Sequence, residues 1–354
     1  MIIAFDVHKS YTQVCVENEQ GEIVLEKRIG QKRGVFVEFL KQFAPDTPVA
    51  LETTYNWYWI VNEIEQAGML PRLTNARLAK LMLANSNKTD KLDARGLNKL
   101  QRTGTLPTVW IPSANIRDNR ELPRTRMVMA NQRTRTKNRI HSIIDKYGLN
   151  DMFEGISDMF GKKGKSKLMS AIELLPDNTR WTMLRLIENL EFVESHISAI
   201  EERMRKVYND NPEMQLIRTL PGVGFILSVV IVSEIGDITR FPSDKHLASY
   251  SGVVPTVHSS GGKTYYGRLR KDVNRYLKWA YTEAANQVCL HRRNSKYRHA
   301  VSLYERIRKR KGHCKAIGAV ARHICQSSYH VLRTGKVYRE PRSSFDNIDR
   351  LISR

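Results

Sequence analysis

The order of strand and helix patterns in the first 75 residues constrains the fold more than any other feature of the sequence. The apolar run IIAFD is followed by the strand patterns YTQVCVEN and GEIVLEKRI, which a turn near Asn18 to Gly21 joins. Three strands in this succession are typical of an antiparallel meander. The later patterns alternate: a helix over 34–43, a strand over 48–52, a helix near 57–66 and a strand near 69–73. A meander followed by this alternation predicts a mixed α/β sheet.

Helical patterns dominate the rest of the chain. The Arg-rich stretch 124–146 contains no proline and has one apolar stripe, which predicts a long basic helix. Farther along, apolar residues recur at alternating spacings of three and four positions, as in a coiled-coil seam. They are Met183, Leu186, Leu190, Val193, Ile197, Ile200, Met204 and Val207. We interpret this seam as a surface for self-association; the alternative is an ordinary amphipathic helix packed on a core.

Positive charge is concentrated near the end of the chain. The protein has 354 residues, with 58 Lys and Arg against 36 Asp and Glu, and a formal net charge of +22. Residues 263–354 contain 23 basic and 6 acidic residues, whereas residues 1–100 contain 13 and 12. A solubility device would spread its charge over the surface, so this local excess predicts a polyanionic partner, and we expect nucleic acid.

No apolar run in the sequence has the length of a membrane span. The longest, over residues 225–232, is broken by Ser228 and falls well short of the roughly 18 residues that a helical span requires. Asp6 interrupts any signal-peptide pattern at the start. We therefore expect a cytoplasmic protein that makes no membrane contact.

Four acidic residues are expected to meet at one edge of the predicted sheet. Asp6 closes the first strand and Glu52 closes the fourth, so their side chains emerge together if these strands are neighbours. Asp90 and Asp93 lie three residues apart in NKTDKLDAR, at the start of a helix, where such residues share a face. Like charges at short range repel, so the cluster requires protons or divalent cations. Oxygen ligands favour Mg²⁺ or Mn²⁺.

Each of these acids alone has a simpler explanation. Asp90 fits a helix N-cap, and Asp6 and Glu52 fit strand ends that face water. Together, in a basic protein, they predict a metal-dependent nuclease site that stabilises the attacking and leaving oxygens of a phosphodiester. The meander also resembles the first half of an actin-like sugar kinase, but DVHKS lacks the glycine that those kinases place soon after the first Asp.

Two glycine-containing segments of the second half are candidate contacts to phosphate. In LPGVG, the backbone NH groups around Gly222 and Gly224 can cradle a phosphate as in helix-hairpin-helix modules, although a plain tight turn explains the pattern equally well. In HSSGGK, Ser259 and Ser260 are expected on a flexible, glycine-flanked loop beside dense positive charge. A serine that attacks a phosphodiester conserves the energy of that bond, so strands can be rejoined without ATP. An ordinary loop is the alternative.

The order of these parts along nearly the whole chain resembles one family. KTDKLDA in the first half, and SSGGK with the following GRLRK in the second, are similar to the DEDD transposases of bacterial insertion sequences, relatives of the Piv DNA invertase. One departure is that Val273 stands where the family tends to have glycine. The resemblance implies a RuvC-like, ribonuclease H-type catalytic domain over 1–115 and a helical linker with a coiled coil over 116–210. It further implies a mostly helical transposase domain with a helix-hairpin-helix-like turn over 211–340, and a basic tail over 341–354.

The resemblance also implies roles for individual residues. The DEDD tetrad maps to Asp6, Glu52, Asp90 and Asp93 as ligands of Mg²⁺ or Mn²⁺. Ser260, directly before a glycine, is the expected nucleophile, and Ser259 is the second candidate. We expect His258 to contact the loop or a phosphate rather than to act as a base. The expected phosphate contacts are Lys88 and Lys91 near the metals and Lys263, Arg268, Arg270 and Lys271 near the serine.

By the same resemblance, the protein is expected to act as an RNA-guided recombinase in the bacterial cytoplasm, at the nucleoid. A structured noncoding bridge RNA would pair with donor and target DNA, and a 5′-phosphoserine would link protein to DNA during strand exchange. A dimer or tetramer would combine one subunit's acidic site with another's serine. Two alternatives remain from the residues alone: a RuvC-like nuclease that uses water, and a noncatalytic nucleic-acid-binding scaffold.

Overall fold

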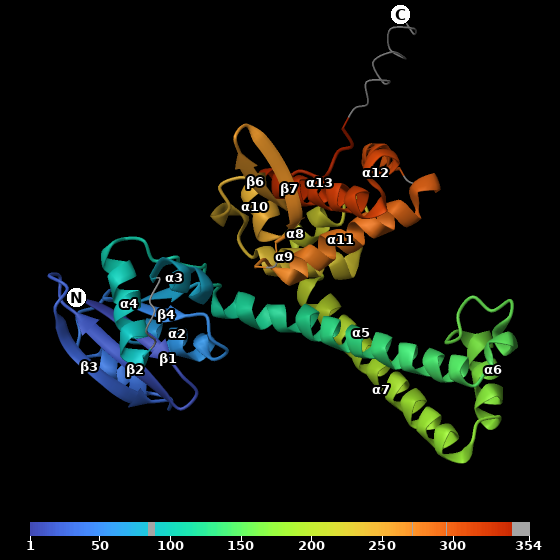
Figure 1. Cartoon of the computed structure of the whole chain (residues 1–354), viewed down its shortest axis with the longest axis horizontal. Coiled ribbons are helices and arrows are strands. Elements are labelled where there is room, and N and C mark those ends of the chain that lie inside the picture. Colours follow the sequence, from blue (N-terminus) through green and yellow to red (C-terminus); the bar gives the residue numbers. More distant parts are fainter. Residues whose placement is uncertain (84–88, 271, 295, 342–354) are drawn as a thin grey trace, which may run out of the picture. The chain divides into compact units, whose positions relative to one another are not determined.

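The structure is a computed structural model that describes residues 1–83, 89–270, 272–294 and 296–341. The chain forms two compact units, Met1–Pro112 and Ser113–Arg354, and each is described by itself (Figure 1). Lys88, Lys271 and residues 342–354 of the expected basic tail lie outside the described residues. Within the described part, no helix is both long enough and apolar enough to span a membrane.

The first unit is built on a five-stranded mixed sheet, which confirms that part of the prediction. Its strands are β1 (Ile2–Val7), β2 (Tyr11–Glu17), β3 (Ile23–Gly30), β4 (Pro48–Glu52) and β5 (Leu70–Thr74). They are arranged in the order β3-β2-β1-β4-β5. The first three strands pair antiparallel, as expected of a meander, and β4 and β5 extend the sheet in parallel with β1. The most apolar strand, β1, therefore occupies the centre.

Helices cover both faces of this sheet. They are α1 (Val35–Leu40), α2 (Trp57–Gln66), α3 (Ala76–Leu83) and α4 (Asp90–Arg102). The first two share a buried cluster with Phe5, whose ring centroid lies 5.4 Å from that of Phe36. Since side chains alternate along a strand, Ala4 points to the opposite face, where it forms a cluster with Ala50 and Leu97 of α4. The small alanine side chains let α4 lie close to β1 and β4.

The second unit begins with a long basic helix, α5 (Ala114–Lys146). This helix begins before the Arg-rich stretch in which we expected it, and it contains Pro123. Because proline has no NH, the carbonyl of Asn119 loses its partner inside the helix. The hydroxyl of Tyr208 donates to that carbonyl at 3.4 Å, which explains why the helix continues through the proline.

The apolar seam predicted over 183–207 lies on α7 (Asp177–Tyr208), which packs along α5 (Figure 1). Met183 and Leu190 are buried in one cluster with Ile140 of α5, and Met204 is buried in the core of the C-terminal helices. Other helices of the same chain therefore cover the seam. The seam is not the exposed self-association surface that we expected, because a spacing of three and four residues does not reveal which helix will cover it.

Two short helices, η1 (Asn150–Phe153) and α6 (Lys162–Glu173), share a buried cluster with α5 and α7. The other elements form a helical domain with one hairpin. Its helices are α8 (Pro212–Ile217), α9 (Phe225–Ile235), η2 (Ile238–Arg240), α10 (Asp244–Tyr250), α11 (Arg275–Leu290), η3 (Arg292–Asn294), α12 (Arg298–Lys311) and α13 (His313–Thr334). The hairpin consists of β6 (Pro255–Ser260) and β7 (Lys263–Leu269). Tyr281 is fully buried in the core, with its hydroxyl 2.6 Å from that of Ser328.

A buried carboxylate joins α5 to this core. Glu234, at the end of α9, is fully buried and accepts two hydrogen bonds from Arg124 of α5, at 2.7 and 3.0 Å. It also accepts one at 2.8 Å from Asn274, the N-cap of α11. Arg120 adds a bond of 2.8 Å to the carbonyl of Ser233. Charge-assisted bonds of this kind are short and directional, so the cluster fixes three helices against one another.

Replacing Glu234 with alanine is expected to lower the free energy of unfolding of the second unit by about 3–5 kcal/mol, because the guanidinium of Arg124 would lose its buried partner. Chemical denaturation followed by circular dichroism measures the change. Glu202→Ala is the matched control: it breaks an exposed pair with Lys206 and is expected to leave the midpoint unchanged. Equal shifts in the two variants would contradict this role of Glu234.

Candidate active site

Asp6 and Glu52 lie at the carboxyl ends of neighbouring parallel strands. The register pairs Ala4 with Ala50 and Phe5 with Leu51. Asp6 directly follows Phe5, and Glu52 directly follows Leu51, so the two acids are at matching positions of the two strands. Alternation places them on the same face as Ala4 and Ala50, which is the face that α4 covers. The sheet therefore points both carboxylates toward the side on which α4 packs.

Helix α4 brings the other two acids to this edge. Thr89 is the N-cap, and its side chain accepts a bond of 3.3 Å from the NH of Leu92. The alternative that Asp90 is itself the cap is therefore wrong. Asp90 and Asp93 both lie in the first turn, where the helix dipole favours negative charge.

Direct contacts connect Asp6 with Asp90 through a histidine. Nε2 of His8 lies 2.9 Å from Oδ2 of Asp6 and 3.4 Å from Oδ1 of Asp90. The hydroxyl of Tyr11 donates to Oδ2 of Asp90 at 2.7 Å, and the guanidinium of Arg28 donates to the same oxygen at 3.1 Å. Two donors from β2 and β3 therefore fix the orientation of Asp90.

The electrostatic environments of the two acids differ. Burial raises the pKa of Asp6 above its usual value; His8 opposes this effect, and the negative charges of Asp93 and Asp90 add to it. The hydroxyl of Tyr11 lowers the pKa of Asp90, and the positive charges near it act in the same direction. A nearby cation would therefore favour the ionised form of Asp6 against the effect of burial.

The residues present fit a divalent cation. Asp6, His8 and Asp90 each offer one ligand atom, and these atoms all lie within 4.8 Å of one another. Carboxylate oxygens that close repel unless positive charge lies between them. Glu52 ends the neighbouring strand, and Asp93 is near enough for its charge to act on Asp6. The edge of the sheet is thus a candidate metal site.

His8, Tyr11 and Arg28 were not among the site residues that the sequence predicted. His8 follows Asp6 by two positions, which was a usable signal, since such residues share one side of an extended chain. Tyr11 and Arg28 reach the site only because β2 and β3 return antiparallel beside β1. No local pattern reveals the register of those pairings.

Ser259 and Ser260 lie on a strand rather than on the flexible loop that we expected. They end β6, and the turn of the hairpin consists of Gly261 and Gly262, with φ values of 56° and 76°. Two successive residues with positive φ form the tight turn that suits the twist of a hairpin, and glycine adopts it without strain. Ser260 pairs in register with Lys263. Both serine side chains are exposed.

The two serines face opposite sides of the hairpin. The hydroxyl of Ser259 lies 3.3 Å from that of Thr264, its cross-strand neighbour. Ser260 shares its side with Lys263 and with His258, which pairs with Tyr265. The side chain of Lys263 therefore lies on the same side of the hairpin as that of Ser260, opposite to that of Ser259.

The predicted phosphate contacts fall into two groups. Lys91 on α4 and Lys263, Arg268 and Arg270 at the hairpin are all exposed, as phosphate contacts must be. Gly222 has φ of +70°, and a Cβ there would collide with the carbonyl of Ala284 in α11. Close packing on α11 is therefore enough to explain the glycine at position 222. At Gly224, the N-cap of α9, a Cβ would meet open space. A role of this turn in phosphate binding stays a prediction.

Two known families match the sequence. Residues 3–149 match a DEDD-type transposase family of IS110, and residues 214–302 match the Transposase IS116/IS110/IS902 family. The first match contains all four expected acids, and the second contains the hairpin with both serines.

Several curated relatives are similar over most of their length. The chain is 24% identical over 340 residues to the transposase for insertion sequence element IS1111A of Coxiella burnetii. This match covers 96% of this chain and 91% of that protein. Over 284 residues it is 22% identical to the transposase for insertion sequence element IS1328 of Yersinia enterocolitica, covering 80% and 82%. A shorter match, 30% identical over 99 residues, covers 25% of this chain and 31% of the pilin gene-inverting protein of Moraxella bovis.

The acidic edge of the mixed sheet, together with these matches, places the chain among the DEDD transposases of insertion sequences. Specifically, it belongs to the IS116/IS110/IS902 family of transposases.

Replacing Asp6 with asparagine is expected to weaken Mn²⁺ binding at least about tenfold, because it removes a negative ligand from the group formed with His8 and Asp90. Isothermal titration calorimetry with manganese chloride measures the affinity. Asp46→Asn is the matched control, since Asp46 is an exposed acid of the same unit that lies on a turn. Unchanged Mn²⁺ affinity in Asp6→Asn would count against the metal site.

Proposed function

We propose that this protein is the transposase of an insertion sequence and recombines DNA with Ser260 as its nucleophile. The observation that carries the proposal is the meeting of Asp6, His8 and Asp90 at the end of β1, inside the segment that matches the transposase family. The hairpin adds support, because it presents Ser260 in an exposed position beside Lys263.

In this proposal the metal ligands are Asp6, Glu52, Asp90 and Asp93, with His8 as an additional ligand. A bound Mg²⁺ or Mn²⁺ supplies Lewis-acid stabilisation of the charge that develops on the scissile phosphate. The imidazole of His8 favours Mn²⁺ over Mg²⁺ more than carboxylates alone would. The mixed sheet with acids at its strand ends supports a RuvC-like, ribonuclease H-type assignment of the first unit.

The proposed reaction conserves phosphodiester bonds. The Ser260 hydroxyl attacks the scissile phosphorus and loses its proton to solvent, while the bond to the 3′ oxygen breaks. The products are a serine ester of the 5′ phosphate and a free 3′ hydroxyl. The 3′ hydroxyl of a partner strand then attacks the ester, and the serine leaves with a proton. Ser260 is preferred over Ser259 because the hydroxyl of Ser259 already has Thr264 as its neighbour.

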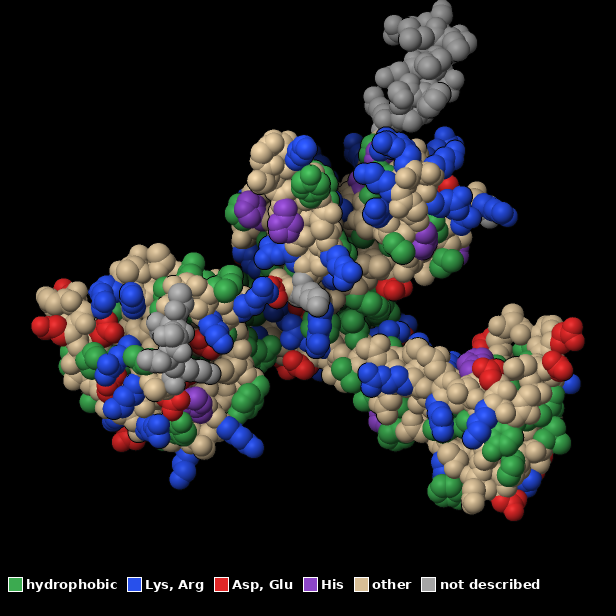
Figure 2. All heavy atoms as spheres, in the orientation of Figure 1, with side chains coloured by type: hydrophobic (Ala, Val, Ile, Leu, Met, Phe, Trp, Pro, Cys, Tyr) green, Lys and Arg blue, Asp and Glu red, His purple; other side chains and the backbone are tan. Residues whose placement is uncertain are grey.

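The proposed partners are donor DNA, target DNA and a structured bridge RNA from the same element. Charge supports nucleic acid of some kind: in Figure 2, Lys and Arg side chains gather around the position of α12. The last turn of α12 alone contains Arg308, Lys309, Arg310 and Lys311. We further propose a dimer or tetramer in which the acids of one copy act with Ser260 of another.

Ser260→Ala is expected to abolish covalent attachment of protein to DNA, because the ester can form only at that hydroxyl. Protein, element-end DNA, the adjoining noncoding RNA and Mn²⁺ are incubated and denatured, and DNA that migrates with protein is measured on a gel. Ser259→Ala is the matched control: it removes a hydroxyl of the same strand and should retain the adduct.

Other outcomes of this assay discriminate among functions. Cleavage without adduct that survives in Ser260→Ala would indicate a nuclease that uses water. An adduct that is lost in Ser259→Ala but retained in Ser260→Ala would show that Ser259 is the nucleophile. Absence of cleavage under every condition would favour a noncatalytic scaffold.

A further inference from the structure

The second unit contains a pocket of about 800 Å³ that the proposed reaction does not use. One wall is α11, whose residues Trp279, Glu283 and Gln287 are spaced four positions apart and so form one row along the helix. The opposite wall is the turn before α9 together with the first turn of that helix. This volume falls within the range of pockets that hold small organic groups.

Gly222 holds the two walls at their present distance. A side chain there would collide with the carbonyl of Ala284, so glycine allows the turn to approach α11 closely. The turn then leads into α9, and Gly224, Phe225, Ile226 and Leu227 line the pocket. The N-cap, Gly224, has no side chain that could accept from the first NH groups of this helix, so these groups can bind an acceptor in the pocket.

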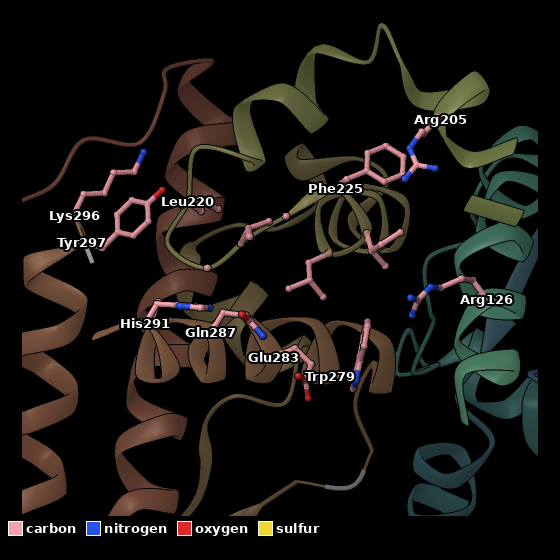
Figure 3. A pocket seen from close by; sticks show the side chains of 16 residues that line it. Arg126, Arg205, Leu220, Phe225, Trp279, Glu283, Gln287, His291, Lys296 and Tyr297 are labelled. Carbon is pink, nitrogen blue, oxygen red and sulfur yellow. The ribbon is translucent and has the colours of Figure 1, made fainter. Parts of the chain in front are cut away.

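Positive charge is found at both ends of the pocket. Figure 3 shows Arg126 and Arg205 at one end and Lys296 with Tyr297 at the other, with the α11 row between them. Arg126 and Arg205 share one acidic partner, Glu201, at 2.9 and 4.0 Å, so that end keeps a net positive charge. An anionic ligand is therefore favoured, and a helix N-terminus between such residues suits a phosphate.

Aromatic side chains provide the apolar part of the pocket. Trp279, Phe225 and Tyr297 are each partly buried and line it. The guanidinium of Arg205 lies 5.3 Å from the centroid of the Phe225 ring. Aromatic faces beside cationic groups are the combination on which unpaired bases stack while their phosphates are bound.

One acidic residue distinguishes this pocket from a general anion site. Glu283 follows Trp279 by one helical turn, and no described residue forms a salt bridge with it. A carboxylate accepts hydrogen bonds from the exocyclic amino groups of cytosine and adenine, whereas thymine and uracil offer it only N3–H, which lies between two carbonyl oxygens that repel a negative charge. Gln287, one turn farther along, offers both a donor and an acceptor.

We propose that this pocket binds one unpaired nucleotide whose base carries an exocyclic amino group. The base stacks on Trp279 with its amino edge toward Glu283, and the phosphate lies at the start of α9 near Arg205. This inference rests on the proposed function only for the class of partner, nucleic acid. The same nucleotide chemistry can come from unpaired DNA or from RNA.

Binding of dye-labelled short oligonucleotides, measured by fluorescence anisotropy on the full chain, tests the proposal. The probes are oligo-dA, oligo-dC and oligo-dT with their ribose counterparts oligo-A, oligo-C and oligo-U. Trp279→Leu is expected to weaken binding of the adenine and cytosine probes roughly 5- to 160-fold, the range for loss of one stacked base. Trp279→Phe keeps an aromatic face and should restore most of the affinity. Trp181→Leu, which changes an exposed tryptophan of α7, should bind as the wild type does.

Base preference provides a second measurement that loss of folding would not imitate. Glu283→Gln is expected to remove the preference for adenine and cytosine over thymine and uracil, while the thermal melting curve stays unchanged. The stronger response among the deoxyribose or the ribose probes identifies DNA or RNA as the source. Unchanged affinity and base preference in both Trp279→Leu and Glu283→Gln would overturn the proposal. Because binding needs no cleavage, that result is independent of the adduct assay with Ser260→Ala.

Discussion

Repulsion among carboxylates at the end of β1 is the constraint on which the chemistry of the first unit depends. Burial already raises the pKa of Asp6, and the charges of Asp93 and Asp90 add to that effect. The fold imposes this arrangement through packing, because α4 lies over Ala4 and Ala50 and brings its acidic first turn to the strand ends. Perturbed acids that a fold holds together in this way are typical of functional sites.

The second unit combines a rigidly held core with an exposed hairpin. Glu234 fixes α5, α9 and the start of α11 in one hydrogen-bonded cluster. The hairpin leaves this core between α10 and α11, and all side chains of β7 are exposed. A two-stranded sheet without an apolar cover gains little stability of its own. Its order therefore depends on the helices at its base, and its exposed tip is suited to contact a large partner. Trp279 and Glu283 lie on α11, the helix that directly follows the hairpin.

The sequence predicted what depends on local pattern. Strand alternation placed Asp6 and Glu52 at strand ends, and the spacing within NKTDKLDAR placed Asp90 and Asp93 on one helical turn. It did not predict what depends on pairing at long range. His8, Tyr11 and Arg28 converge on Asp90 through turn and sheet geometry, and the seam of α7 is covered by a helix of the same chain.

Two predictions from local sequence were wrong: the loop at the serines and the start of α5. Adjacent glycines between Ser260 and Lys263 are a hairpin turn signal. The helix predicted over 124–146 began just after Pro123, whereas α5 begins at Ala114 and continues through the proline. The carbonyl that the proline leaves without a partner accepts a hydrogen bond from another helix.

Anomalous diffraction from crystals soaked in Mn²⁺ tests the central claim most directly. The account predicts a manganese peak between Asp6 and Asp90, at about 2.0–2.6 Å from carboxylate oxygens, and loss of that peak in Asp6→Asn crystals. A peak elsewhere, or ordered Asp6 and Asp90 side chains without manganese in soaked crystals, would contradict it.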